Sequence, residues 1–134
     1  MKRIFVLSLS AFTLFSFFAF NQKPSFDLKA SIVRGKDVYV ANCTSCHMEM
    51  GEGIEDVYPP LAKSDYMMAD KKRSIRQVLK GVTGEMKVNG KVYNGEMLSF
   101  ELSDQEVSDV LNYVRNSFGN KGEAVTPAEV KGSR

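Results

Sequence analysis

The feature that most constrains this chain is the run Cys43-Thr44-Ser45-Cys46-His47, which contains both of its cysteines and its only histidine. Two thiols three residues apart on one turn can reach two vinyl groups on neighbouring pyrrole rings, and the next side chain then lies under the iron. The run fits the C-x-x-C-H pattern of haem attachment. We therefore expect thioether bonds from Cys43 and Cys46, and an axial iron ligand from His47.

Two other chemistries use a C-x-x-C pair. A disulfide or thiol-exchange site suits an exported chain, but the alternation of strands and helices expected around a thioredoxin-type motif is missing. A zinc site would need two further good ligands, and the sequence has no other cysteine or histidine. Haem attachment is the interpretation that uses all three residues.

The N-terminus has the pattern of an export signal. Met1 to Arg3 carries two positive charges, and Ile4 to Phe20 contains no charged residue. The cleavage pattern is imperfect and the apolar run is slightly short of the ~20 residues that span a bilayer. We expect residues 1–20 to be a signal peptide or an N-terminal membrane anchor, and the protein to be periplasmic or otherwise extracytoplasmic, soluble or anchored by this segment.

The rest of the chain has the length of one domain. We expect a linker over 21–30, a single domain over 31–120 and a flexible tail over 121–134. The formal net charge of +2 equals the two charges of Lys2 and Arg3, so the remaining charges balance. This balance gives no support to a nucleic-acid role or a basic docking face, and it predicts modest electrostatic steering of partners.

Helix signals dominate this domain. Apolar residues at helical intervals predict a helix over 32–42, directly before the cysteines. Asp70 suits the cap of a helix over 71–80, which Gly81 can end in a left-handed conformation. A serine-to-glutamate capping box at 103–106 predicts the start of the last helix. The fold expected is mainly α, with three to five helices around one covalent haem.

One short sheet is expected beside these helices. Asn89-Gly90 is the strongest short signal for a two-residue hairpin turn, and 86–88 and 91–93 would form its strands. Residues 48–60 contain two glycines and two prolines and predict a long loop. The hairpin would lie before the segment that supplies the sixth iron ligand.

The residues also suggest what completes the iron site. A metal-bound imidazole normally donates its other ring N–H to a fixed acceptor, and the carbonyl of Pro59 is the candidate for His47. Methionine is a common core residue, so position has to decide which one binds iron. Met97 is favoured because it lies in the irregular segment after the hairpin, whereas Met86 belongs to a predicted strand. Met86 stays the alternative.

At this point the chain resembles a known family, the class I c-type cytochromes. Gly35 and Tyr39 precede Cys43 by eight and four positions. They are similar to the small residue and the aromatic residue of the N-terminal helix of that family. Val110 and Tyr113 look like their packing partners on the C-terminal helix. The resemblance implies the class I cytochrome c fold, in which these two helices cross.

Further motifs resemble the cytochrome domains that accompany bacterial dehydrogenases, reductases and oxidases. They are Pro59-Pro60-Leu61-Ala62, Gly81, Tyr93-Asn94-Gly95-Glu96-Met97 and Leu102-Ser103-Asp104. The resemblance extends over about 32–120. It implies one covalent haem c, a haem pocket that includes Pro59, Leu61 and Tyr93, and Met97 as the second axial ligand.

The function that this resemblance implies is electron transfer without catalysis. Single electrons would pass between redox proteins, a dehydrogenase or reductase on one side and an oxidase on the other. Many members of the family have proline directly after the methionine ligand, where this chain has Leu98. That difference supports the alternative, a haem enzyme or ligand-binding haem protein with an open or labile sixth iron position.

Overall fold

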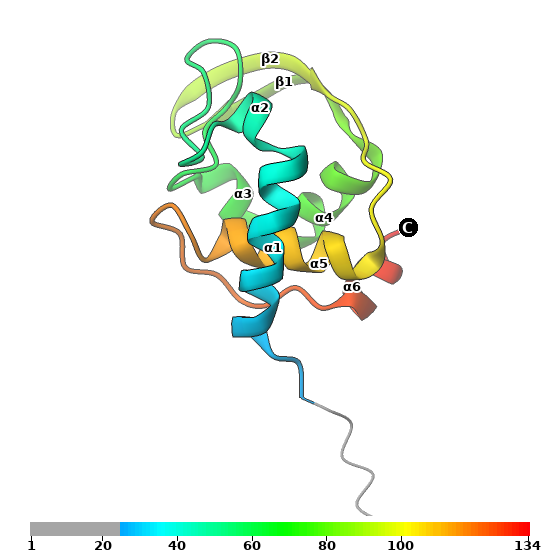
Figure 1. Cartoon of the computed structure of the whole chain (residues 1–134). Helices are drawn as coiled ribbons and strands as arrows, with labels where there is room; N and C mark the ends of the chain where they lie inside the picture. Colours follow the sequence, from blue (N-terminus) through cyan, green and yellow to red (C-terminus); the bar gives the residue numbers. More distant parts are fainter. Residues whose placement is uncertain (1–24) are drawn as a thin grey trace, which may run out of the picture.

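The computed structural model describes residues 25–134, so the expected export segment at 1–20 and residues 21–24 of the expected linker lie outside the described residues. A two-stranded hairpin arches over the top of the molecule with the long loop beside it, and most of the helices lie beneath them (Figure 1). In chain order the elements are α1 (Leu28–Asn42), α2 (Thr44–His47), α3 (Asp65–Ala69), α4 (Lys71–Lys80), β1 (Val82–Val88), β2 (Lys91–Met97), α5 (Asp104–Arg115) and α6 (Pro127–Lys131).

The mainly α architecture is confirmed, but the expected three to five helices are too few. The described residues form six helices, because α2, α3 and α6 are single turns of four or five residues. Such short helices leave no apolar periodicity to detect in a sequence. None of the helices within 25–134 is long and apolar enough to cross a membrane.

The predicted crossing of the first and last long helices is confirmed. α1 begins four residues earlier than expected, at a cap formed by Asp27. It crosses α5 at Gly35, where an added Cβ would lie 1.9 Å from the carbonyl oxygen of Asp109. Tyr39 is 1% exposed and packs with Val110 and Val114 of α5. The two backbones therefore touch at a position that only glycine can occupy.

A buried carboxylate also links α1 to α5 at this crossing. Asp109 of α5 is 2% exposed. It accepts hydrogen bonds from Ser31 Oγ at 2.5 Å and from Arg34 Nε and Nη2 at 2.7 and 2.8 Å. A buried carboxylate is costly without such partners. Both Ser31 and Arg34 come from α1, so these bonds fix its position along α5.

The expected flexible tail at 121–134 is wrong. Val125 and Val130 are fully buried in a core cluster with Ile75, Val107 and Leu111. Ser108 and Asn112 of α5 donate to the carbonyl of Val125 at 2.7 and 2.8 Å. Thr126 and Glu129 form a capping box that begins α6. The C-terminal segment thus completes the core beneath α4 and α5.

The hairpin is present and longer than expected. Its turn residues Asn89 and Gly90 have φ angles of 51° and 84°, as a type I′ turn requires. The strands pair in register from Val88↔Lys91 to Val82↔Met97. Met97 therefore ends a strand instead of lying in an irregular segment, and the positional reason for favouring it over Met86 does not hold.

Candidate functional site

The end of α1 positions the cysteines and the histidine. Cys43 closes α1 through its N–H to the carbonyl of Tyr39 at 2.8 Å, and its own carbonyl accepts from His47 N at 2.9 Å. One tight turn, α2, therefore carries Cys46 and His47. The two thiols are free and no disulfide joins them.

His47 makes the hydrogen bond expected from the sequence. Its Nδ1 lies 3.0 Å from the carbonyl oxygen of Pro59. Because a carbonyl oxygen only accepts, Nδ1 carries the hydrogen and donates it. The other ring nitrogen, Nε2, then has a free lone pair. This is the arrangement that a metal-bound imidazole needs.

The loop after α2 holds Pro59 in place. The hydroxyl of Tyr39 donates to the carbonyl of Met48 at 2.7 Å, which ties the start of the loop to α1. Gly53 has a φ of +67°, and a Cβ there would lie 2.4 Å from the carbonyl oxygen of Tyr58. The glycine lets the loop fold back on itself, so the Pro59 carbonyl returns beneath the imidazole.

A cavity of about 490 Å³ lies against these residues. Cys43, Cys46 and His47 line one wall, and the hairpin lines another. The volume falls in the range of about 300–1,000 Å³ that is usual for ligand and cofactor sites. The structure also brings the other residues expected at the site to this cavity, namely Pro59, Leu61, Tyr93 and Met97.

Met86 reaches the same cavity as Met97. Met86 pairs with Tyr93, and Met97 pairs with Val82. Residues two or four apart on a strand, and their direct partners, share one face. The inner face of the hairpin therefore offers two half-buried thioethers to the cavity, and strand geometry alone does not choose between them.

One part of the cavity wall is polar and was not predicted from the sequence. Tyr66 of α3 and Gln77 of α4 both line the cavity, and Gln77 Nε2 donates to the Tyr66 hydroxyl at 3.1 Å. Ser74 and Val78 line it from the same side of α4. Positions 74, 77 and 78 have the spacing of one helix face. The spacing of these three positions could have identified this face of α4 as part of the wall. Because two of the three residues are polar, however, the face shows no apolar pattern in the sequence.

Burial also shifts the pKa values of two groups at the site. It lowers the pKa of the His47 imidazole, although the bond to Pro59 acts in the opposite direction. It raises the pKa of the Cys43 thiol to about 11, and the neighbouring Cys46 adds to this effect. A reactive thiol-exchange cysteine needs a lowered pKa. The environment of Cys43 is therefore unlike that of a thiol-exchange site.

The donor set suits an iron porphyrin better than a bare metal ion. No group of three or more histidine, cysteine or acidic side chains within residues 25–134 could hold a metal ion. What the cavity offers is two thiols on one turn, one oriented imidazole and thioethers on the facing wall. These are the attachment points and axial ligands of a c-type haem.

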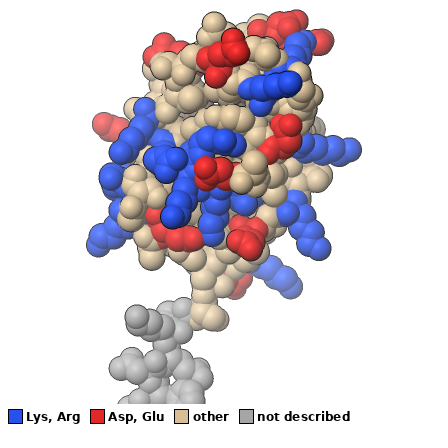
Figure 2. Space-filling model, turned by 180° about the vertical axis from the view of Figure 1, so that it is seen from behind, with Lys and Arg blue, Asp and Glu red and all other residues tan. Residues whose placement is uncertain are grey.

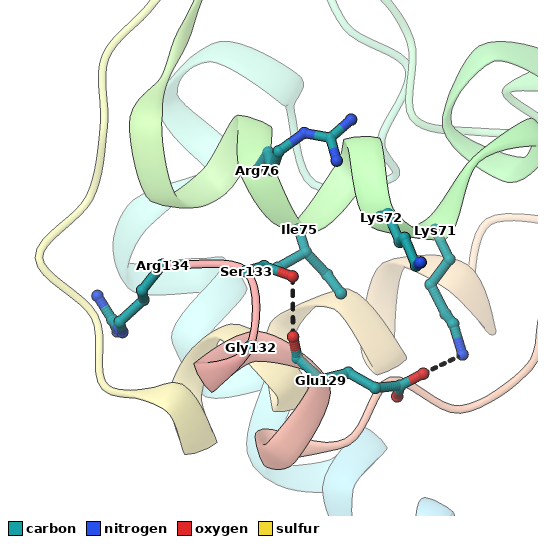
Figure 3. A pocket seen from close by; sticks show the side chains of 8 residues that line it. All are labelled: Lys71, Lys72, Ile75, Arg76, Glu129, Gly132, Ser133 and Arg134. Carbon is teal, nitrogen blue, oxygen red and sulfur yellow. Dashed lines mark hydrogen bonds and ion pairs between the residues drawn. The ribbon is translucent and has the colours of Figure 1, made fainter.

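A second cavity, of about 420 Å³, lies between α4 and the end of the chain (Figure 3). Lys71, Lys72, Arg76 and Arg134 bring basic side chains to it, and Lys71 pairs with Glu129 at 2.6 Å. No cysteine, histidine or methionine lines it. The chemistry expected from the sequence is therefore confined to the first cavity.

Comparisons with known proteins agree with this site. The sequence profile of the family Cytochrome c matches residues 32–118. Cytochrome c-552 of Thermus thermophilus is 36% identical over 91 residues, covering 64% of this chain and 69% of that protein. Cytochrome c6 of Nostoc sp. (strain PCC 7120 / SAG 25.82 / UTEX 2576) is 32% identical over 117 residues, covering 85% and 92%.

A third relative is larger. The cytochrome c subunit of the quinone alcohol dehydrogenase of Gluconobacter oxydans (strain 621H) is 33% identical over 96 residues. The match covers 70% of this chain but only 20% of that subunit. The comparison is therefore with one part of the subunit.

The fold and the cavity define a haem-binding, electron-transferring domain of mainly α structure. The chain belongs to the cytochrome c family, and its cofactor is one covalently bound haem c.

Proposed function

We propose that this protein carries single electrons between extracytoplasmic redox partners, with its haem attached through Cys43 and Cys46 and ligated by His47 and Met97. The observation that carries the proposal is the hydrogen bond from His47 Nδ1 to the Pro59 carbonyl at 3.0 Å. It leaves Nε2 free beside a cavity that the two cysteines and Met97 also line. Met97 is preferred to Met86 because the family resemblance places the ligand there.

The haem supplies a reversible one-electron couple, and the chain's own residues determine how that couple behaves. Pro59 keeps the imidazole oriented and raises its basicity through the hydrogen bond. Leu61, Val110 and Val114 line the cavity with apolar surface and exclude water. A dry site disfavours the additional charge of ferric iron, and a methionine ligand does the same. Both effects raise the reduction potential, which suits a carrier.

The location and partners follow from two further observations. The N-terminal run from Ile4 to Phe20 without charged residues supports export, with or without retention as an anchor. Two relatives are cytochrome subunits of an alcohol dehydrogenase and a fructose dehydrogenase. Electrons released by such a dehydrogenase could pass to this chain and then to an oxidase.

The test uses the protein produced with a working haem maturation system. Its mass should exceed that of the polypeptide by one haem, and acid-acetone should not extract the haem. Cys43→Ser and Cys46→Ser should each leave a single thioether. A mass equal to the haem-free chain would overturn the proposal and favour a thiol protein.

The same sample tests the alternative of an open iron position. A carrier with both axial positions filled gives a low-spin reduced spectrum that carbon monoxide does not change. Ready binding of carbon monoxide would show that the sixth position is open or labile, and would make a ligand-binding haem protein the better account.

A further inference from the structure

Exposed apolar side chains gather at the mouth of the haem cavity. Val57 and Leu98 line the cavity and are nevertheless 53% and 71% exposed, so they lie at its opening. Met50 and Ile54, from the same loop as Val57, are 65% and 38% exposed. Apolar side chains that stay this exposed at the opening of a cavity mark a contact site for another molecule.

The charges around this apolar mouth are mostly negative. Residues 37–62, which include the loop, contain five acidic residues and no lysine or arginine. Glu96, which lines the cavity from β2, is also exposed. Lys91 reaches the loop, but Glu55 and Asp56 hold it at 2.7 and 2.9 Å. One lysine thus faces two carboxylates, and the local charge stays negative.

The balancing positive charge lies on another face. α4 contains five basic residues and no acidic one, and the cavity between α4 and α6 is lined by lysines and arginines. Seen from behind, basic side chains are most numerous across the middle of the molecule, with some acidic ones among them, and both signs occur at its upper end (Figure 2). The loop after α2 lies at that same upper end in Figure 1. The neutral total charge thus hides an acidic segment beside the mouth and a basic α4.

We infer that the mouth of the haem cavity docks an electron-transfer protein whose contact surface is apolar at its centre and rimmed by lysine or arginine. This inference rests on the proposed function, because it names the partner class for the same haem site. Protein interfaces combine an apolar centre with a polar rim, which is the arrangement around Val57 and Leu98. Complementary charge on the rim steers the encounter, whereas a partner with an acidic rim would be repelled.

The test measures electron transfer from the reduced holoprotein to two small oxidants of opposite charge, tris(1,10-phenanthroline)cobalt(III) and ferricyanide. A negative mouth attracts the cation and repels the anion, and salt screens both effects. The second-order rate constant for the cobalt complex should fall as ionic strength rises, and that for ferricyanide should rise. Opposite trends, or rate constants that do not respond to salt, would overturn the inference.

A pair of variants then locates the charge. Glu52→Gln together with Glu55→Gln removes two charges from the loop, and the amide oxygens can still accept hydrogen bonds from Met50 N and Lys91 Nζ. At low ionic strength the rate constant for the cobalt complex should fall on the order of threefold, and that for ferricyanide should rise.

The matched control is Glu123→Gln together with Glu129→Gln, which makes the same charge change in the C-terminal segment. Glu129 pairs with Lys71 at 2.6 Å, as Glu55 pairs with Lys91 at 2.7 Å. This control should leave both rate constants close to those of the unmodified protein. Equal effects in the two double variants would overturn the inference, because only total charge would then matter. In either case electron transfer to both oxidants would leave the proposed function standing, whereas a haem that neither oxidant oxidises would overturn both.

Discussion

The two walls of the haem cavity are built in different ways. On the side of α1 and α5, eight of the 12 residues of α5 are buried, and Gly35 brings the two helix backbones into contact. On the other side, only Val88 and Tyr93 are buried among the two strands of seven residues each. The first wall has its position fixed by close packing. The second is a thin hairpin whose outer face is exposed.

This difference separates the two proposed axial ligands. The helix crossing, the Tyr39 hydroxyl and the Pro59 carbonyl fix the histidine side of the site. The methionine side depends on a two-stranded sheet and on the end of α4, where Phe100 N donates to the carbonyl of Val78 at 3.2 Å. We therefore expect substitutions in the first wall to change the stability of the whole domain. Substitutions in the second wall should change ligation of the iron.

The largest effect is expected from Gly35→Val. The new Cβ would overlap the Asp109 carbonyl, so the helices must separate and the domain loses about 3 kcal/mol of unfolding free energy. Denaturation with guanidinium, followed by the haem absorbance, should show an earlier midpoint while the haem stays attached. Gly95→Ala is the control in the hairpin, since its nearest neighbour to a new Cβ is at 3.9 Å. A midpoint for Gly35→Val no lower than that of the control would show that the helices do not meet there.

The C-terminal segment belongs to the packed wall, and Val130→Ala tests that assignment. Val130 is fully buried with Ile75 and Val107, so removing two methyl groups should cost about 2 kcal/mol. The same substitution at Val92, which is 49% exposed in β2, should cost less than about 0.5 kcal/mol. Thermal unfolding of the two variants measures the difference. Equal melting temperatures would mean that the tail is mobile after all.

A smaller loss of stability is expected from Gly81→Ala, with a change in ligation. Gly81 has a φ of +73°, and a Cβ there would lie 2.4 Å from the carbonyl of Met97. The strain should cost about 1–2 kcal/mol and displace the segment that carries the methionine. The near-infrared sulfur-to-iron absorption of the ferric protein should weaken or shift. If stability falls and the absorption is unchanged, Gly81 is needed only to end α4 and does not affect the binding of methionine to the iron.

Much of this architecture follows from local signals in the sequence. Asp70 and Gly81 bound α4, and the Ser103–Glu106 capping box begins α5 as predicted. Asn89-Gly90 places the hairpin turn. Each of these signals acts within a few residues, so no knowledge of tertiary contacts was needed.

The C-terminal segment was missed although it contains a similar signal. Thr126, Pro127 and Glu129 form a capping box with proline in the first turn. The helix that follows is only five residues long, so no apolar period reveals it. Val125 is buried because Ser108 and Asn112 of α5 bind its carbonyl, a contact between distant residues.

The site likewise has a part that local sequence signals predict and a part that depends on the tertiary structure. The adjacency of Cys43, Cys46 and His47 indicated the haem chemistry, and the acceptor Pro59 lies at the end of the predicted loop over 48–60. The two methionines could not be ranked, because the length of the strands places both on the inner face of the hairpin. Net charge was also uninformative, since acidic and basic residues occupy different stretches of the chain.

The sixth ligand of the iron is tested by comparing the ferric spectra of Met97→Ala and Met86→Ala. Met97→Ala should lose the near-infrared sulfur-to-iron band, have a lower reduction potential and bind carbon monoxide when reduced. Met86→Ala should keep the band and lose only stability, about 1–3 kcal/mol. Loss of the band in Met86→Ala with its retention in Met97→Ala would contradict the assignment of the sixth ligand. Retention of an unchanged spectrum in both variants would contradict methionine ligation from the hairpin altogether.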